Sequence, residues 1–131
     1  MSDVSYGYGK TVDEDFDATI GKVTEALKGE GFGVLTEIDM TATLKKPLGV
    51  ASRQYEVLGA CNPPMAHKAL SAELELGLLL PCNVIVYEND EGKTQVSVIN
   101  PMEMFKVVNN PAMTEVADIV NGKLMRVVES L

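Results

Sequence analysis

Apolar residues recur every three or four positions in two long stretches of the chain, which is the pattern of a helix that packs one face on a core. The first stretch carries this stripe at Phe16, Ile20, Val23 and Leu27. Thr11 and Glu14 have the spacing of a capping box, so we expect the helix to begin at Thr11 and to end at Gly29.

The second long helix is predicted after Asn110, an N-cap residue, and Pro111, which suits a first helical turn. Its stripe runs through Met113, Val116, Ala117, Val120, Leu124, Val127 and Leu131.

Period-two alternation, the pattern of a half-buried strand, predicts five strands at about 4–8, 32–38, 55–61, 84–87 and 94–99. The last two form a hairpin around Asn89–Gly92, in which Cys82, Val84 and Val86 share a face and lie opposite Val98, Val96 and Thr94 respectively. Short helices are predicted at about 40–48 and, capped by Asn62, at about 64–70.

These elements indicate an α+β fold: a mostly antiparallel sheet of about five strands, with two long helices and the short helices packed on one face. No predicted strand is a continuous Val/Ile run, which argues against a doubly wound parallel sheet. The 131 residues fit one domain, spanning 1–131.

Charge and composition narrow the function. Lys plus Arg number 11 against 19 Asp plus Glu, a net charge of −8, which argues against a nucleic acid or an anionic membrane as partner. The chain opens on polar residues, and its apolar runs are short, so we expect a cytoplasmic protein with its two cysteines as free thiols.

The candidate ligand-binding residues are Cys61, Asn62, His67, Cys82 and Asn83. Cys61 ends a strand where a helix begins, and the positive end of that helix would favour a thiolate. If the strands of Cys61 and Cys82 are neighbours, both thiols meet near His67. Three functions then stay open: a soft-metal site of thiolates and imidazole, a redox dithiol, or a small-ligand pocket with one nucleophilic cysteine.

Ordinary packing is the competing explanation, since a free cysteine behaves as a small buried hydrophobe. The chain has no C-x-x-C or H-x₃-H zinc motif, no dinucleotide or phosphate loop and no G-x-S-x-G elbow. The residues alone therefore identify neither a reaction nor a cofactor.

Two motifs point to a family. They are Gly-Ala-Cys-Asn-Pro at 59–63 and Leu-Leu-Pro-Cys-Asn at 79–83, with supporting segments at 31–38 and 44–50. Together they resemble the prokaryotic family catalogued as domain of unknown function 302, over most of the chain. The resemblance implies a TATA-binding-protein-like α+β architecture and a homodimer, but no known reaction. Asn100 stands where that family often has Asp before Pro-Met, which puts any acid–base role of that position in doubt.

We therefore expect a homodimeric accessory protein that binds a small molecule or a soft metal near the two cysteines. The alternatives are a cysteine-dependent redox or sulfur-handling enzyme, and a purely structural or protein-interaction domain.

Overall fold

Five strands form one antiparallel sheet in the order β1-β5-β4-β3-β2. The computed structural model describes residues 4–49 and 52–131. The strands are β1 Gly7–Val12, β2 Gly33–Asp39, β3 Tyr55–Cys61, β4 Cys82–Glu88 and β5 Thr94–Ile99. All four neighbouring pairs are antiparallel, so the expected α+β class and five-stranded sheet are confirmed.

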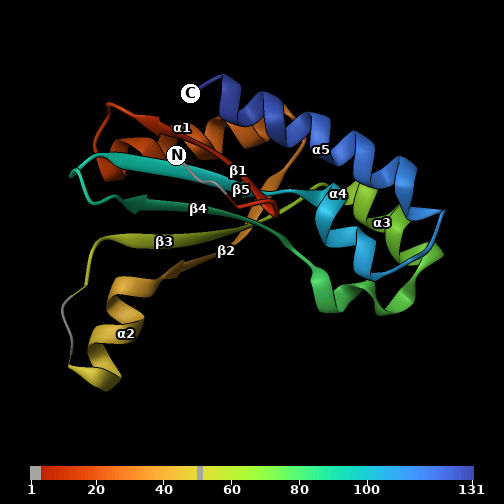
Figure 1. Cartoon of the computed structure of the whole chain (residues 1–131), viewed down its shortest axis with the longest axis horizontal. Coiled ribbons are helices and arrows are strands. Elements are labelled where there is room, and N and C mark those ends of the chain that lie inside the picture. Colours follow the sequence, from red (N-terminus) through yellow and green to blue (C-terminus); the bar gives the residue numbers. More distant parts are fainter. Residues whose placement is uncertain (1–3, 50–51) are drawn as a thin grey trace.

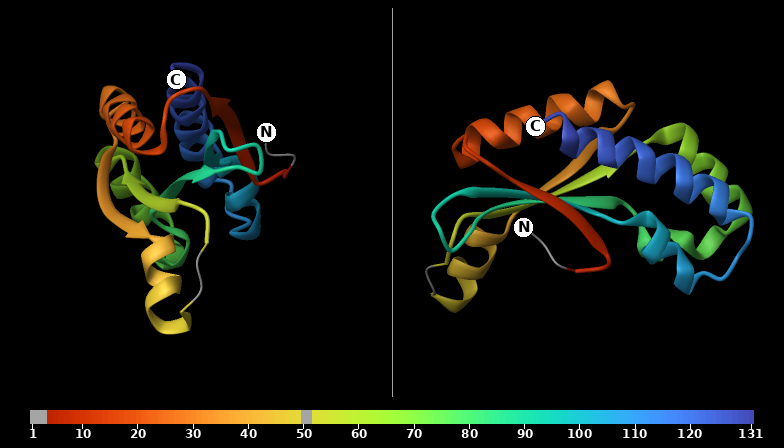
Figure 2. Two further views of the ribbon diagram at one scale, coloured as in Figure 1. Left: turned by 90° about the vertical axis from the view of Figure 1, so that its left-hand side faces the viewer. Right: turned by 45° about the horizontal axis from the view of Figure 1, so that its top comes forward.

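Two long helices, α1 (Phe16–Gly29) and α5 (Met113–Glu129), cover one face of this sheet (Figure 1). Shorter elements cluster beyond one end of the sheet, beside the first half of α5; they are α3 Pro63–Ala72, the 3₁₀ segment η1 Leu74–Leu79, α4 Pro101–Met104 and η2 Phe105–Val107. The helix α2 (Met40–Leu48) lies at the other end and away from α1 and α5 (Figure 2). No helix in the described ranges is long and apolar enough to cross a bilayer.

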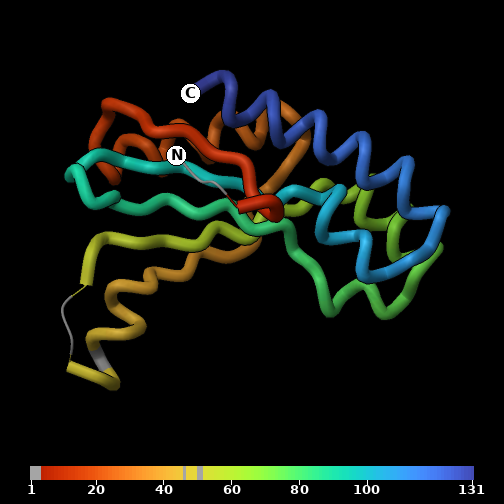
Figure 3. Tube along the Cα trace, in the orientation of Figure 1, coloured from red at the N-terminus to blue at the C-terminus, as the bar shows by residue number. Residues whose placement is uncertain are grey.

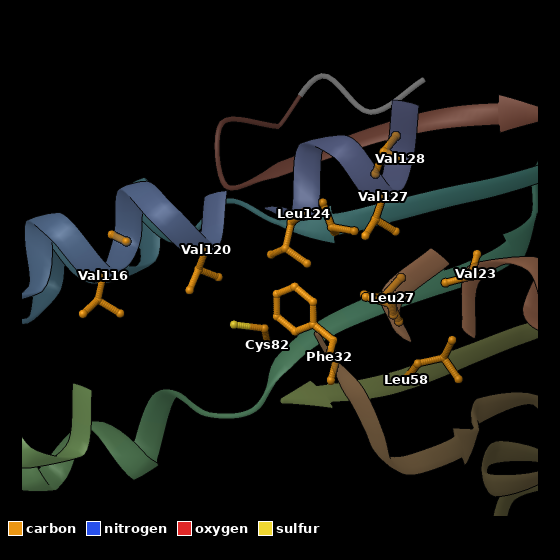
Figure 4. Close-up of a cluster of buried hydrophobic side chains, with 14 of the residues drawn as sticks. Val23, Leu27, Phe32, Leu58, Cys82, Val116, Val120, Leu124, Val127 and Val128 are labelled. Carbon is orange, nitrogen blue, oxygen red and sulfur yellow. The ribbon is translucent and has the colours of Figure 1, made fainter. Parts of the chain in front are cut away.

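The main core lies between the sheet and the two long helices. Leu58, Val84 and Val98 are opposite one another on adjacent strands, and each is almost fully buried. Figure 4 shows Val23 and Leu27 of α1, with Leu124 and Val127 of α5, packing over Leu58 and its neighbours. Fully burying each such side chain stabilises the fold by roughly 1.5–3 kcal/mol.

The first long helix begins later than its capping box predicts. Thr11 belongs to β1, where its hydroxyl donates to Gln95 Oε1 over 2.7 Å. Asp15 caps α1 instead, and its Oδ1 accepts from the Ala18 N–H at 2.7 Å. Pairing with β5 therefore overrides the local capping signal at Thr11.

The β4–β5 hairpin has the predicted face but a register shifted by two residues. Val84 lies opposite Val98 and Val86 opposite Val96, whereas the pattern alone placed Val84 opposite Val96. A shift of two residues keeps every side chain on its face, so alternation cannot distinguish these registers. The turn sets the register, because the Asn89 Oδ1 accepts from the backbone N–H groups of Glu91 and Lys93.

The last helix begins at Met113, two residues past Pro111, and the Asn110 Oδ1 accepts from the Ala112 N–H. Asn62 caps α3 as expected, and α2 spans 40–48 with Pro47 inside it. The segment η1 was not predicted, since its leucines follow neither a helical nor an alternating period. Only Leu76 of η1 is buried, while Leu74 and Leu78 are exposed.

Candidate functional site

An apolar cavity of about 340 Å³ lies at the end of the sheet where β3 finishes and β4 begins. Its walls come from those strand ends, from α3 and η1, and from α5. The larger lining side chains are Phe32, Met65, Leu80, Phe105, Val116 and Val120. Leu35 and Gly77 lie at the rim, since they are the lining residues exposed to solvent. Among the residues that the structure describes, no Lys, Arg, Asp, Glu or His lines the cavity.

Both cysteines line this cavity. The β3–β4 register places Ala60 opposite Cys82, so Cys61 directly follows the residue that faces Cys82. The chain enters β4 directly from η1, as the tube in Figure 3 shows, and this brings Cys82 to the cavity wall. In Figure 4 the Cys82 sulfur points toward the side of Phe32 on which Val116 and Val120 lie.

The two thiols differ in their surroundings. Cys82 is 7% exposed, whereas Cys61 is half-buried. Burial, and after it the charge of the neighbouring Cys61, raise the pKa of the Cys82 thiol to about 11. Cys82 is therefore a neutral thiol at physiological pH, which is a poor nucleophile.

The start of α3 does not supply the donors that a thiolate at Cys61 would use. Pro63 and Pro64 have no N–H. The next two backbone N–H groups, of Met65 and Ala66, donate to Asn62, to its Oδ1 at 3.3 Å and to its carbonyl oxygen at 2.8 Å. The first four residues of α3 therefore have no free backbone N–H. This helix end cannot stabilise a thiolate at Cys61 by hydrogen bonds, as the sequence had suggested.

The five candidate residues separate into two groups. Cys61, Asn62 and Cys82 line the cavity, and the Asn62 side chain is buried there as the cap of α3. His67 lies exposed on α3 and does not line the cavity. Asn83 lies on the opposite face of the sheet, because it follows Cys82 directly in β4.

The cavity residues that sequence reasoning missed come from distant parts of the chain. Phe32, Phe105 and Val120 carry no local signal of a site, since each reads as ordinary core. Met65 does carry one, because it lies in the first turn of the helix that directly follows Cys61 and its cap Asn62.

The opposite face of the sheet is here named the outer face, and none of its described strand residues is charged, although Arg53 lies beside Tyr55 and Tyr87. The register defines three rows on it: Thr11, Gln95, Tyr87 and Tyr55; Gly9, Ser97, Ile85, Val57 and Ile38; and Asn83, Gly59 and Thr36. None of these residues is charged, although 30 of the 131 residues are Lys, Arg, Asp or Glu. The rings of Tyr55 and Tyr87 stack on this face with centroids 5.3 Å apart.

The family model for the domain of unknown function DUF302 matches residues 8–131. The chain belongs to this family. An uncharacterized conserved DUF302 protein from Bacillus stearothermophilus shares 30% sequence identity with this DUF302 protein, and its crystal structure matches the fold with a TM-score of 0.90. The alignment covers 96% of this chain and 98% of that one. No curated protein matches, so the comparisons establish family and fold and leave the function to the site.

Proposed function

We propose that this DUF302 protein binds a small, uncharged and largely apolar ligand in the cavity beside Cys61 and Cys82. The observation that carries the proposal is the lining itself: an open cavity of about 340 Å³ whose walls hold apolar side chains and two thiols but no charged group. Its volume lies within the roughly 300–1,000 Å³ typical of small-molecule sites.

The chemistry of the walls favours binding over thiolate catalysis. Each Å² of apolar ligand surface that is buried in the cavity stabilises the complex by roughly 25 cal/mol. A ligand carboxylate or phosphate would find no cation and no free helix N–H at the lining residues. The Cys82 thiol, with its raised pKa, is a weak polar contact that can orient a ligand.

The redox-dithiol alternative has less support from the register. Cys82 pairs with Ala60, and consecutive strand residues point to opposite faces, so the ladder directs Cys61 and Cys82 apart. A disulfide between them would need the end of β3 to rearrange.

A matched pair of ligands tests the proposal. The thermal midpoint is measured with decan-1-ol and with decanoate, which differ mainly in charge. The alcohol is expected to stabilise the fold, by about 2.7 kcal/mol at a hundredfold excess over Kd, and the acid much less. Equal effects of both ligands, or none from a wider set of neutral apolar compounds, would refute the proposal.

A pair of variants on one helix locates the site. Ala66 lines the cavity, whereas Ala72 is exposed at the end of α3. Ala66→Leu is expected to weaken binding of the alcohol, and Ala72→Leu to leave it unchanged. Equal affinities for the two variants would place the ligand elsewhere.

We also propose that the protein is a homodimer joined through its outer face. Two chains of charge −8 repel one another, and the outer face is where a second copy can approach without meeting like charges. Stacked tyrosines and aliphatic side chains are typical of such interfaces. Five strands about 4.8 Å apart and about 20 Å long give a face of roughly 500 Å². A stable dimer buries roughly 800 Å² per partner, so exposed neighbours such as Tyr6 must add to it.

Sedimentation equilibrium tests the dimer. The unmodified protein is expected to sediment as a dimer, and Ile85→Glu, at the centre of the outer face, to sediment as a folded monomer. Thr114→Glu on the exposed side of α5 is the control and is expected to remain dimeric. A monomeric unmodified protein, or a dimer that tolerates Ile85→Glu, would exclude this interface.

A further inference from the structure

The lining of the cavity changes from buried residues to exposed ones. Its exposed part, here named the mouth, is formed by Leu35 of β2 and Gly77 of η1. Its buried end includes lining residues that are at most 7% exposed: Phe32, Ala69, Phe105, Val116 and Val120. A bound ligand therefore has one end among buried apolar side chains and the other end beside solvent.

A bulge in β2 directs Leu35 to the mouth. Val34 and Thr36 pair with consecutive residues of β3, so Leu35 between them is an extra residue without a partner. Val34 packs against the core, and in a regular strand the next side chain would point to the outer face. The extra residue breaks this alternation, and Leu35 lines the cavity instead. Its side chain is nevertheless 66% exposed, so much of its apolar surface is available to cover a ligand.

The buried end offers little to a polar group. Among the described lining residues, Asn62 alone carries an amide or hydroxyl side chain. Its Oδ1 accepts from the Met65 N–H, and its Nδ2 donates to the Glu30 carbonyl oxygen. The thiols of Cys61 and Cys82 form only weak hydrogen bonds. A ligand hydroxyl buried there without a partner would lose about 5- to 150-fold in affinity, so the polar end of the ligand belongs at the mouth.

We infer that the ligand is a neutral amphipath with one alkyl chain, which fills the cavity and leaves its polar head in the mouth between Leu35 and Gly77. The inference rests on the proposed function, because it names the class of ligand for the same cavity. Leu35 closes onto the chain where it leaves the cavity. Gly77 leaves room for the head, since a Cβ added there would meet no described atom within 4 Å.

The volume and the charge of the site support this class. A cavity of about 340 Å³ is near the lower limit of small-molecule sites, which suits one chain rather than two. The head is uncharged, because partial loss of water in an apolar mouth penalises a charge much more than a hydroxyl. The net charge of −8 also repels an anionic head.

Three probes with the same ten-carbon chain test the class by titration calorimetry below their critical micelle concentrations. Decyl β-D-glucoside has a bulky neutral head and is expected to bind within about threefold of decan-1-ol, because its sugar lies outside the mouth. Decane-1,10-diol is expected to bind at least about fivefold more weakly than decan-1-ol, because its second hydroxyl is buried. Exclusion of the glucoside, or a diol that binds as tightly as the alcohol, would overturn the inference.

A spin label gives the orientation of the ligand directly. A decyl chain with a nitroxide at its head is expected to broaden the NMR signals of Leu35 and Gly77 more than those of Val116 and Val120. The reverse order, or equal broadening at the two ends of the cavity, would overturn the inference.

Two leucine variants test the contact at the mouth. Leu35 and Leu48 are 66% and 65% exposed, but Leu48 lies on α2 and does not line the cavity. Leu35→Ala is expected to lower the affinity for decan-1-ol about tenfold, because the apolar surface that covers the chain is lost. Leu48→Ala is expected to leave the affinity unchanged. Equal affinities for the two variants would show that the ligand does not leave past Leu35.

Failure of this inference is distinguishable from failure of the proposed function. If decan-1-ol binds but the glucoside is excluded, the neutral apolar site stands and the head at the mouth is wrong. If neither decan-1-ol nor any other neutral apolar compound binds, the proposed function is wrong and the inference falls with it.

Discussion

Replacing Ala69 with leucine tests whether the cavity is open in solution. Ala69 lies on α3, is 2% exposed and lines the cavity. Leucine adds three carbons, and burying each in unoccupied apolar space is worth about 0.8 kcal/mol. Ala69→Leu is therefore expected to raise the free energy of unfolding by up to about 2.4 kcal/mol. It is also expected to weaken binding of decan-1-ol, because the new side chain occupies the same space.

Ala117→Leu is the matched control. Ala117 is also helical and 2% exposed, but it packs in the core of α5 and does not line the cavity. Extra carbons in a filled core force displaced side chains, so this variant is expected to lose about 1–3 kcal/mol. Both values come from urea unfolding followed by circular dichroism. Equal destabilisation of the two variants would show that the space beside Ala69 is filled, and would refute the cavity.

Three further predictions concern the surroundings of the site. The pKa of the Cys82 thiol rises from 9.0 in the unfolded chain to about 11 in the folded protein. As the pH increases between these two values, the free energy of unfolding is therefore expected to fall by roughly 2–3 kcal/mol more in the unmodified protein than in Cys82→Ala. Gly59→Ala would drive its Cβ against the Thr36 hydroxyl and is expected to cost about 1–3 kcal/mol, whereas Gly33→Ala meets open space and costs little. Asn62→Ala removes the cap of α3 and is expected to cost about 1–2 kcal/mol in urea unfolding.

Each of these expectations has a result that contradicts it. Identical pH dependence of unfolding in the unmodified protein and in Cys82→Ala would mean that the thiol is not buried in solution. Equal losses for Gly33→Ala and Gly59→Ala would show that the outer face has room at Gly59. Asn83→Ala, at an exposed position, serves as the control for Asn62→Ala, and a similar loss in both would remove the capping role.

Local chemistry predicted much of the fold. The cap at Asn62 and the two prolines after it define the start of α3. The predicted stripe of α5 identifies most of the residues that the helix buries, but Leu131 lies beyond its end and Val128 is buried as well. Prediction failed where pairing with a distant strand overrode a local signal or where the pattern was degenerate. Thr11 carries a capping signal, yet its partner in the sheet decides its structure. The pattern could not distinguish two registers of the β4–β5 hairpin that differ by two residues, because both registers bury the same face.

The candidate site was predictable only in part. Alternation places Cys82 on the core face with Val84, and it places Asn83 on the other face, so the separation of Asn83 from the cavity is implicit in the strand. Nothing local indicates that His67 lies outside the cavity while Met65, two residues earlier, lines it. That depends on how α3 is rotated against α5 and η1, which contacts between the elements determine.

The sequence by itself determined the amphipathic stripes, the strand faces, the cap at Asn62 and the family motifs that contain both cysteines. These follow from the three-dimensional spacing of near neighbours, which the backbone geometry of a helix or strand fixes. Only the tertiary structure decided that Cys61, Met65 and Cys82 share a wall with Phe32 and Val120. A cavity is the space that packing leaves between elements distant in the chain, so no local pattern encodes it.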